Sequence, residues 1–266
     1  MPFLFYNEKR IYFEDSGLGN VIVLLHGFTE SLKIWEHFVK ILSTEFRIVA
    51  IDLPGHGRSE SVGTVHSMEL FAEVVKKVIT VLNISKCLMI GHSMGGYVTL
   101  AFASKYPEML KGIGIFHSHS FADSPEDKKT RDRTIHFVRQ DKFSFITQFI
   151  PGLFPEEVQA KYAPEIENLV NEAWKMSKDA VTAALEGMKI RSDQTKLLKS
   201  INLPVLFILG LKDTRAPLSR LWEMVSLPAH SESLILKNVG HMGFIEAPDE
   251  TLQTIRHFAM KIFSGS

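Results

Sequence analysis

A serine lies between glycines in residues 91–96, which read Gly-His-Ser-Met-Gly-Gly at the spacing Gly-x-Ser-x-Gly. An apolar run over residues 87–90 precedes this motif, and a second run over residues 97–103 follows it. The pattern predicts a strand, a sharp turn at the serine and a helix. Such a turn leaves the hydroxyl exposed above a sheet, and its glycines are required because side chains there would collide with neighbouring elements. The motif predicts that Ser93 is a nucleophile.

A serine hydroxyl is a weak nucleophile at neutral pH and needs a neighbouring base. Among the eleven histidines, His241 fits best, because it follows a predicted strand ending near Leu236 and lies between Gly240 and Met242-Gly243. The glycines allow the loop to bring the imidazole to the edge of the sheet. We predict that His241 takes the proton of Ser93.

The imidazole must in turn be oriented by a carboxylate, and two aspartates follow predicted strands. Asp213 comes after the strand at residues 205–209, and Asp123 comes after the strand ending at Phe116. Both would reach the carboxyl ends of the strands. We favour Asp213 because the tight turn at Gly210 fixes its direction, whereas Asp123 opens a helical insertion. The chain order is then Ser, Asp, His.

Attack on a carbonyl creates an oxyanion, which two backbone N–H groups can hold. The N–H of Met94 is the first donor, since it lies at the start of the helix after the serine. The turn His26-Gly27-Phe28 follows the predicted strand at residues 21–25, and it offers the N–H of Phe28 as the second donor. We expect His26 to brace this loop by hydrogen bonding.

These side chains need a scaffold in which many strands end at one edge. Strand and helix signals alternate along the chain, which predicts one doubly wound α/β sheet. Ligands on such sheets bind at the carboxyl ends of the strands. Strands are predicted at residues 3–6, 10–13, 21–25, 46–51, 87–90, 112–116, 205–209 and 233–236, and helices at 70–82 and 97–106.

Residues 124–199 interrupt the alternation, because they hold helical patterns without a convincing strand. We predict that they form a helical cap inserted after the sixth strand, with residues 1–123 and 200–266 forming the core domain. A cap that leaves the sheet there would overhang Ser93 and roof a pocket. Trp174 is a candidate substrate contact among its aromatic residues, although aromatic residues at helical spacing more often pack in the core. Arg191 could offer a cationic group near the serine, but a solvated surface arginine is favoured.

His117 and His119 flank Ser118 at the end of the sixth predicted strand. Alternation along a strand would place both imidazoles on one face, a spacing that two metal ligands could use. No third ligand is evident, so we predict no metal site. We expect both histidines to line the pocket and to contact a polar group of the substrate.

Together, five segments resemble the α/β-hydrolase superfamily: His26-Gly27-Phe28, residues 52–59, the serine motif, Gly210-x-x-Asp213 and Gly240-His241. The resemblance spans nearly the whole chain and is closest to small cytoplasmic members with a helical cap. It implies an α/β-hydrolase fold, with a mostly parallel eight-stranded sheet whose second strand is antiparallel, helices on both faces and a Ser-His-Asp triad. It also implies that residues 52–59 form a structural turn beside the site.

Composition limits the partners. Thirty basic and thirty acidic residues cancel, so no overall charge attracts nucleic acid or anionic lipid. The single cysteine, Cys87, lies in an apolar strand and is predicted to be buried and inert. With no signal-like N-terminus and no run long enough to span a membrane, we expect a cytoplasmic protein that acts on a small molecule. Nothing in the sequence predicts an oligomeric state.

We therefore predict a serine hydrolase that cleaves a small-molecule carboxylic ester through an acyl-enzyme, without a metal or organic cofactor. A carbon–carbon bond hydrolase or a lactonase could use the same triad. A different class of function, a ligand receptor or a cofactor-free oxygenase or peroxidase, could also use this scaffold. Because caps vary within the superfamily, the sequence does not name the substrate.

Overall fold

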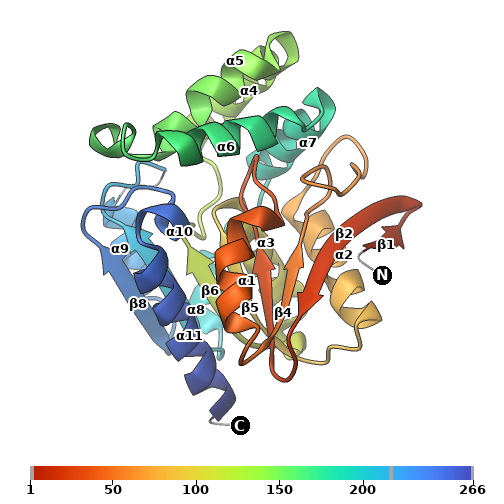
Figure 1. The fold of residues 1–266 in the computed structure, drawn as a ribbon, viewed down its shortest axis with the longest axis vertical. Coiled ribbons are helices and arrows are strands. Elements are labelled where there is room, and N and C mark those ends of the chain that lie inside the picture. The colour runs from red at the N-terminus through yellow and green to blue at the C-terminus, as the bar shows by residue number, and fades with distance from the viewer. Residues whose placement is uncertain (1–2, 216–217, 265–266) are drawn as a thin grey trace.

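The computed structural model describes residues 3–215 and 218–264 (Figure 1). Within this part of the chain, eight strands form one sheet in the order β1-β2-β4-β3-β5-β6-β7-β8. Strand β2 is antiparallel to β1 and β4, and the other pairs are parallel. The strands are β1 (Phe3–Tyr6), β2 (Lys9–Ser16), β3 (Val21–Leu25), β4 (Arg47–Ile51), β5 (Cys87–His92), β6 (Leu110–Phe116), β7 (Val205–Gly210) and β8 (Ser231–Leu236). The predicted eight-stranded, mostly parallel sheet with an antiparallel second strand is confirmed.

Helices cover both faces of the sheet because the central strands are apolar on both sides. All five residues of β3 are buried, and successive side chains enter opposite cores. Val23 and Leu25 pack with the helices of one face, whereas Ile22 and Leu24 pack with those of the other. The first face carries α2 (Met68–Val81), α3 (Met94–Lys105) and α9 (Leu218–Val225), and the second carries η1 (Leu32–Trp35), α1 (Glu36–Leu42), α10 (Gly243–Glu246) and α11 (Pro248–Ser264). The short turn η2 (Pro107–Met109) precedes β6.

Residues 124–199, here termed the cap, are all described and contain helices and no strand. Figure 1 shows α4 to α7 lying across the edge of the sheet at which β3, β5 and β6 end. A capping box starts α4, since Ser124 and Asp127 each bond the other's backbone N–H. The cap comprises the α-helices α4 (Pro125–Gln140), α5 (Lys142–Phe149), α6 (Ala163–Trp174) and α7 (Lys178–Lys189) and the short 3-10 helices η3 (Pro151–Leu153) and η4 (Glu156–Val158). Helix α8 (Thr195–Ser200) begins in the cap and ends one residue beyond it.

The strand order determines where loops from distant parts of the sequence meet. Strand β3 lies between β4 and β5, so its following loop is adjacent to the turn after β5. This reversal of strand order is the position at which open α/β sheets bind ligands. The loop that starts at His26 and the turn at Ser93 therefore lie next to each other.

Cys87 begins β5 and is buried. Burial raises the pKa of its thiol to about 12, so the thiol stays protonated at neutral pH, as an inert cysteine does. Separately, no helix within residues 3–215 and 218–264 combines the length and apolar character needed to cross a membrane.

Candidate active site

Ser93 occupies a strained turn between β5 and α3. Its backbone has φ +50° and ψ −114°, a conformation that side-chain-bearing residues rarely adopt. A Cβ on Gly91 would lie 2.1 Å from the carbonyl oxygen of Gly95, and a Cβ on Gly95 would lie 2.5 Å from that of Leu25. The predicted steric role of both glycines is confirmed. The strain holds the serine at the point of the turn rather than inside the helix.

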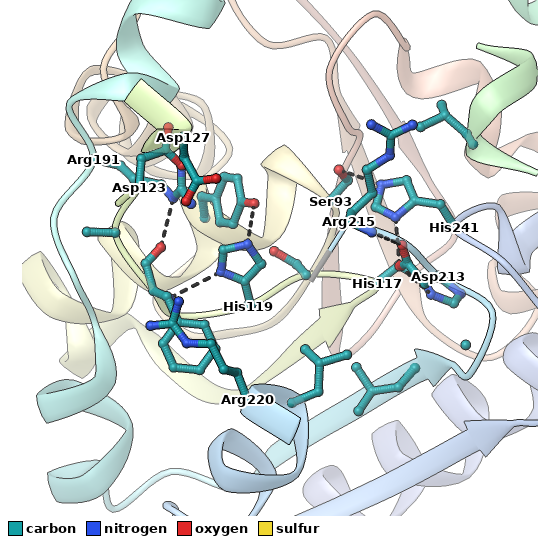
Figure 2. A pocket seen from close by; sticks show the side chains of 18 of the residues that line it. Ser93, His117, His119, Asp123, Asp127, Arg191, Asp213, Arg215, Arg220 and His241 are labelled. Carbon is teal, nitrogen blue, oxygen red and sulfur yellow. Dashed lines mark hydrogen bonds and ion pairs between the residues drawn. The ribbon is translucent and has the colours of Figure 1, made fainter. Parts of the chain in front are cut away.

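The structure brings Ser93, His241 and Asp213 into one hydrogen-bonded relay (Figure 2). His241 Nε2 lies 2.8 Å from Ser93 Oγ, and His241 Nδ1 lies 2.8 Å from Asp213 Oδ2. Asp213 follows β7 in a turn closed by its N–H to the Gly210 carbonyl at 3.2 Å. His241 follows β8, and its N–H donates to the carbonyl of Leu153 in the cap at 3.0 Å. This geometry permits general-base activation of the hydroxyl.

The Asp213 carboxylate is held by several donors. Besides the bond to His241, its Oδ1 accepts the backbone N–H of Arg215 at 2.9 Å. Burial alone would raise the pKa of this carboxyl, but the neighbouring His241 and His117 outweigh burial and hold the pKa well below its usual range. Asp213 is therefore anionic at neutral pH, as a group that orients an imidazolium must be.

Asp123 does not reach His241, because its carboxylate is bound by two arginines of the cap. Arg191 Nη1 lies 2.5 Å from Asp123 Oδ1, and Arg131 binds the other oxygen. The interpretation of Arg191 as a solvated surface residue is wrong, since it is 6% exposed. Its guanidinium also donates to the carbonyls of Phe121 and Met188. The ion pair between Arg191 and Asp123 joins the end of the cap to the residue that directly precedes it.

The two predicted oxyanion donors belong to adjacent elements. Phe28 lies on the loop after β3 and Met94 begins α3, whose start packs against the end of β3. Within the described residues, neither backbone N–H donates a hydrogen bond to a protein acceptor. His26 braces the loop as expected: Nδ1 lies 2.7 Å from the Gly27 carbonyl, and Nε2 accepts the N–H of Leu53 at 3.0 Å.

A buried pair that the sequence did not reveal joins the oxyanion loop to the base. Glu30 Oε2 accepts the Gly27 N–H at 2.6 Å and lies 3.0 Å from His92 Nδ1. His92 Nε2 lies 2.9 Å from the His241 carbonyl. Burial alone would lower the pKa of His92, but the Glu30 carboxylate outweighs burial and raises it. Burial likewise opposes ionisation of Glu30, yet His92 keeps the pKa of Glu30 lowered.

Glu30→Gln is expected to reduce stability most at acidic pH. In the parent, the raised pKa of His92 and the lowered pKa of Glu30 mean that the ionised pair contributes fully between about pH 4.5 and 6.5. In the variant, His92 loses its counter-charge and resists protonation, so stability falls as pH drops below about 6.5. We expect a loss of about 3 kcal/mol near pH 5 and a smaller loss at pH 8, measured by urea unfolding.

Glu36→Gln serves as the matched control, because Glu36 is exposed on α1. It should follow the parent at both pH values. A Glu30→Gln deficit that is equal at pH 5 and pH 8 would contradict an ionised pair.

The expectation that His117 and His119 share one face is wrong. Strand β6 ends at Phe116, and His117 has φ +46°, which breaks the alternation. His117 Nδ1 lies 3.4 Å from Asp213 Oδ2, whereas His119 Nε2 lies 2.9 Å from the Tyr97 hydroxyl. Figure 2 shows the two rings diverging. Burial lowers the pKa of His117 to about 4 and, with the charge of Arg191, that of His119 to about 3, so both are neutral.

A cavity of about 350 Å³ opens beside the relay, a volume suited to a small ligand. Ser93, His117 and His119 line it, and so does Phe149 of the cap. Trp174 does not: it is 38% exposed and packs its edge against Phe143 on the outside of the cap. Contrary to expectation, Trp174 is therefore not part of the lining of this cavity. The described residues also contain no cluster of three metal-binding side chains.

The fold of this chain is that of a known protein family. A family model described as the alpha/beta hydrolase fold matches residues 20–248, and the chain belongs to that family. The chain is 32% identical to a thermophilic esterase from Thermogutta terrifontis, solved with malate bound, with a TM-score of 0.91 over 96% of this chain and 94% of that one.

Two further relatives show the range of this family. The enol-lactonase from Burkholderia xenovorans LB400 has the same fold, with 21% identity and a TM-score of 0.89 over 97% of this chain and 99% of that one. The 2-hydroxy-6-oxononadienedioate/2-hydroxy-6-oxononatrienedioate hydrolase of Escherichia coli (strain K12 / DH10B) is 27% identical, covering 94% of this chain and 90% of that protein. Proteins similar to this chain thus include a solved esterase, a solved enol-lactonase with the same fold and a hydrolase of dienedioate and trienedioate substrates.

Proposed function

We propose that this protein is a serine hydrolase that cleaves a small-molecule carboxylic ester through an acyl-enzyme intermediate. The observation that carries the proposal is the relay in which His241 lies 2.8 Å from both Ser93 Oγ and Asp213 Oδ2. The likeness to a solved esterase at 32% identity supports the ester as substrate.

Each residue of the site has its own role in the proposed reaction. Ser93 Oγ attacks the ester carbonyl while His241 Nε2 takes its proton, and Asp213 stabilises the imidazolium. The N–H groups of Phe28 and Met94 hold the oxyanion of the tetrahedral intermediate. The intermediate collapses as His241 donates the proton to the leaving alcohol. Water, deprotonated by His241, then attacks the acyl-enzyme and releases the acid with Ser93 restored.

A lactonase or a carbon–carbon bond hydrolase is the second candidate, because both classes occur among the relatives. Either reaction would use Ser93 and His241 at the same cavity. The cavity contains polar and cationic side chains at the end away from Ser93, including Arg191, and a polar substrate suits them.

The test is a screen of purified protein against acyl esters of graded chain length, lactones and vinylogous diketones. We expect multiple turnovers of short esters and a covalent acyl adduct on Ser93, detected by mass spectrometry after rapid quenching. A serine-directed phosphonate should label the same residue. Faster turnover of a lactone or diketone than of every ester would shift the assignment to the second candidate. Stoichiometric binding without turnover would favour a receptor, and dependence on oxygen or peroxide would favour an oxygenase or peroxidase.

A further inference from the structure

The cavity beside Ser93 contains an excess of arginine. Four arginines line it, Arg131, Arg191, Arg215 and Arg220, against three aspartates. His117 and His119 add no charge at neutral pH because both are held neutral by burial. A guanidinium removed from water is costly unless a carboxylate or other acceptor compensates it. The groups that compensate the charge therefore have to be identified for each arginine.

Two of the four form ion pairs with a carboxylate, and a third stacks on an aromatic ring. Asp123 binds both Arg131 and Arg191. Arg220 stacks with its guanidinium carbon 3.9 Å from the centre of the Phe121 ring. Its charge also helps to lower the pKa of Asp193, behind the effects of burial and Thr195.

Arg215, like Arg220, has no ion pair among the described residues, but it is the one of the two that lies beside Ser93 and His241 (Figure 2). Its Nη2 donates to the Gly152 carbonyl at 2.9 Å, and its guanidinium carbon lies 5.1 Å from the centre of the Phe149 ring. Among the described residues, no carboxylate lies within ion-pair distance of this guanidinium. Asp213 attracts it from further away, but both Asp213 oxygens already accept hydrogen bonds.

The guanidinium of Arg215 lies at the boundary between the cavity and solvent. The residue keeps exposed surface, yet the surrounding protein lowers the pKa of its guanidinium, an effect opposed by the attraction of Asp213 and Tyr97. Figure 2 shows Arg215 beside Ser93 and His241, with Arg220 near His119 at the other end of the cavity. A planar fork of N–H donors in such a place is suited to a carboxylate.

We propose that Arg215 binds a carboxylate carried by the substrate, so that the preferred substrates are esters with a free acid group. This inference rests on the proposed function, because it specifies the substrate class of the same site. The carboxylate would replace the water around the guanidinium and fix the ester over Ser93. Binding energy from a group remote from the reacting bond then positions the carbonyl.

The test compares monoethyl glutarate with ethyl pentanoate, which have the same chain length but differ in the terminal carboxylate. We expect the parent to show a kcat/KM at least tenfold higher for the half-ester. Arg215→Gln should reduce that ratio about tenfold or more, chiefly through KM for the half-ester, and Arg215→Lys should restore part of it. Arg133→Gln, on the exposed surface of α4, is the matched control and should leave the ratio unchanged.

Two results would overturn the inference. One is a parent that hydrolyses both esters equally well. The other is an Arg215→Gln variant that loses both activities by the same factor, which would show that Arg215 only anchors the cap through Gly152. Either result leaves the serine hydrolase proposal intact.

If neither ester is hydrolysed, the carboxylate site can still be tested by binding, independently of the serine hydrolase proposal. Calorimetry would measure glutarate binding to the Ser93→Ala protein, with and without Arg215→Gln. Tenfold weaker binding in the double variant would support the site. Absence of glutarate binding to Ser93→Ala would reject it.

Discussion

Replacing Ser93 with alanine is expected to lower kcat for the best ester by about 10⁵- to 10⁶-fold, because no other group can form the acyl-enzyme. The fold should be unaffected, since Ser93 is half-buried and, among the described residues, its side chain forms a hydrogen bond with His241 alone. Steady-state assay, together with loss of phosphonate labelling, measures the effect. Ser120→Ala is the matched control, because Ser120 is buried nearby and, within the described part of the chain, its hydroxyl forms one hydrogen bond, to Thr195 at 3.4 Å.

The relay leads to a second prediction, for a variant that lacks the side chains of both Ser93 and His241. Groups that act as one unit lose their effect together, so Ser93→Ala/His241→Ala should be no slower than Ser93→Ala alone. A further large loss in the double variant would mean that His241 acts independently of Ser93. A Ser93→Ala protein with parental ester turnover would exclude Ser93 as the nucleophile.

Asp213→Asn is expected to lower kcat/KM by about 10⁴-fold, because the amide cannot stabilise the imidazolium and favours the wrong tautomer of His241. The neighbouring groups keep the pKa of Asp213 well below its usual range, so this carboxylate is ionised throughout the neutral range. The amide oxygen can still accept the Arg215 backbone N–H, so the turn should persist. Ester kinetics and circular dichroism of the purified variant provide the measurement.

Asp123→Asn is the informative comparison. It leaves the buried Arg191 guanidinium without its carboxylate, so we expect a loss of stability of about 3 kcal/mol. Activity at a temperature where the variant remains folded should fall by less than tenfold. The opposite outcome, with Asp123→Asn inactive and Asp213→Asn active, would identify Asp123 as the carboxylate that orients His241.

The buried Glu30–His92 pair connects these predictions to the oxyanion loop. It bonds the N–H of Gly27, beside Phe28, and the carbonyl of His241. The loop that carries the proposed oxyanion donor Phe28 and the loop that carries the proposed base His241 are thus joined by one buried pair. Gly27 belongs to the same arrangement, because a Cβ there would lie 2.7 Å from Glu30 Oε2.

The sheet, the turn at Ser93 and the positions of the relay members could be predicted from the sequence alone. These features follow from local physics: unbroken apolar runs mark strands buried on both faces, and glycine spacing marks a turn that excludes side chains. Ser93, Asp213 and His241 could be proposed because each directly follows a predicted strand, and parallel strands end at one edge.

Which side chains pair, by contrast, depends on the folded chain. The sequence favours a solvated Arg191, yet this arginine lies buried on Asp123, 68 positions away. The sequence also favours Trp174 as a pocket residue, yet Trp174 does not line the cavity. The left-handed backbone at His117 directs its ring towards Asp213 and away from the face expected to hold His119. Such pairings depend on backbone conformation and packing between elements distant in sequence. They leave no periodic signal in the chain, which is why the charge of the cavity, and Arg215 within it, emerged only from the folded structure.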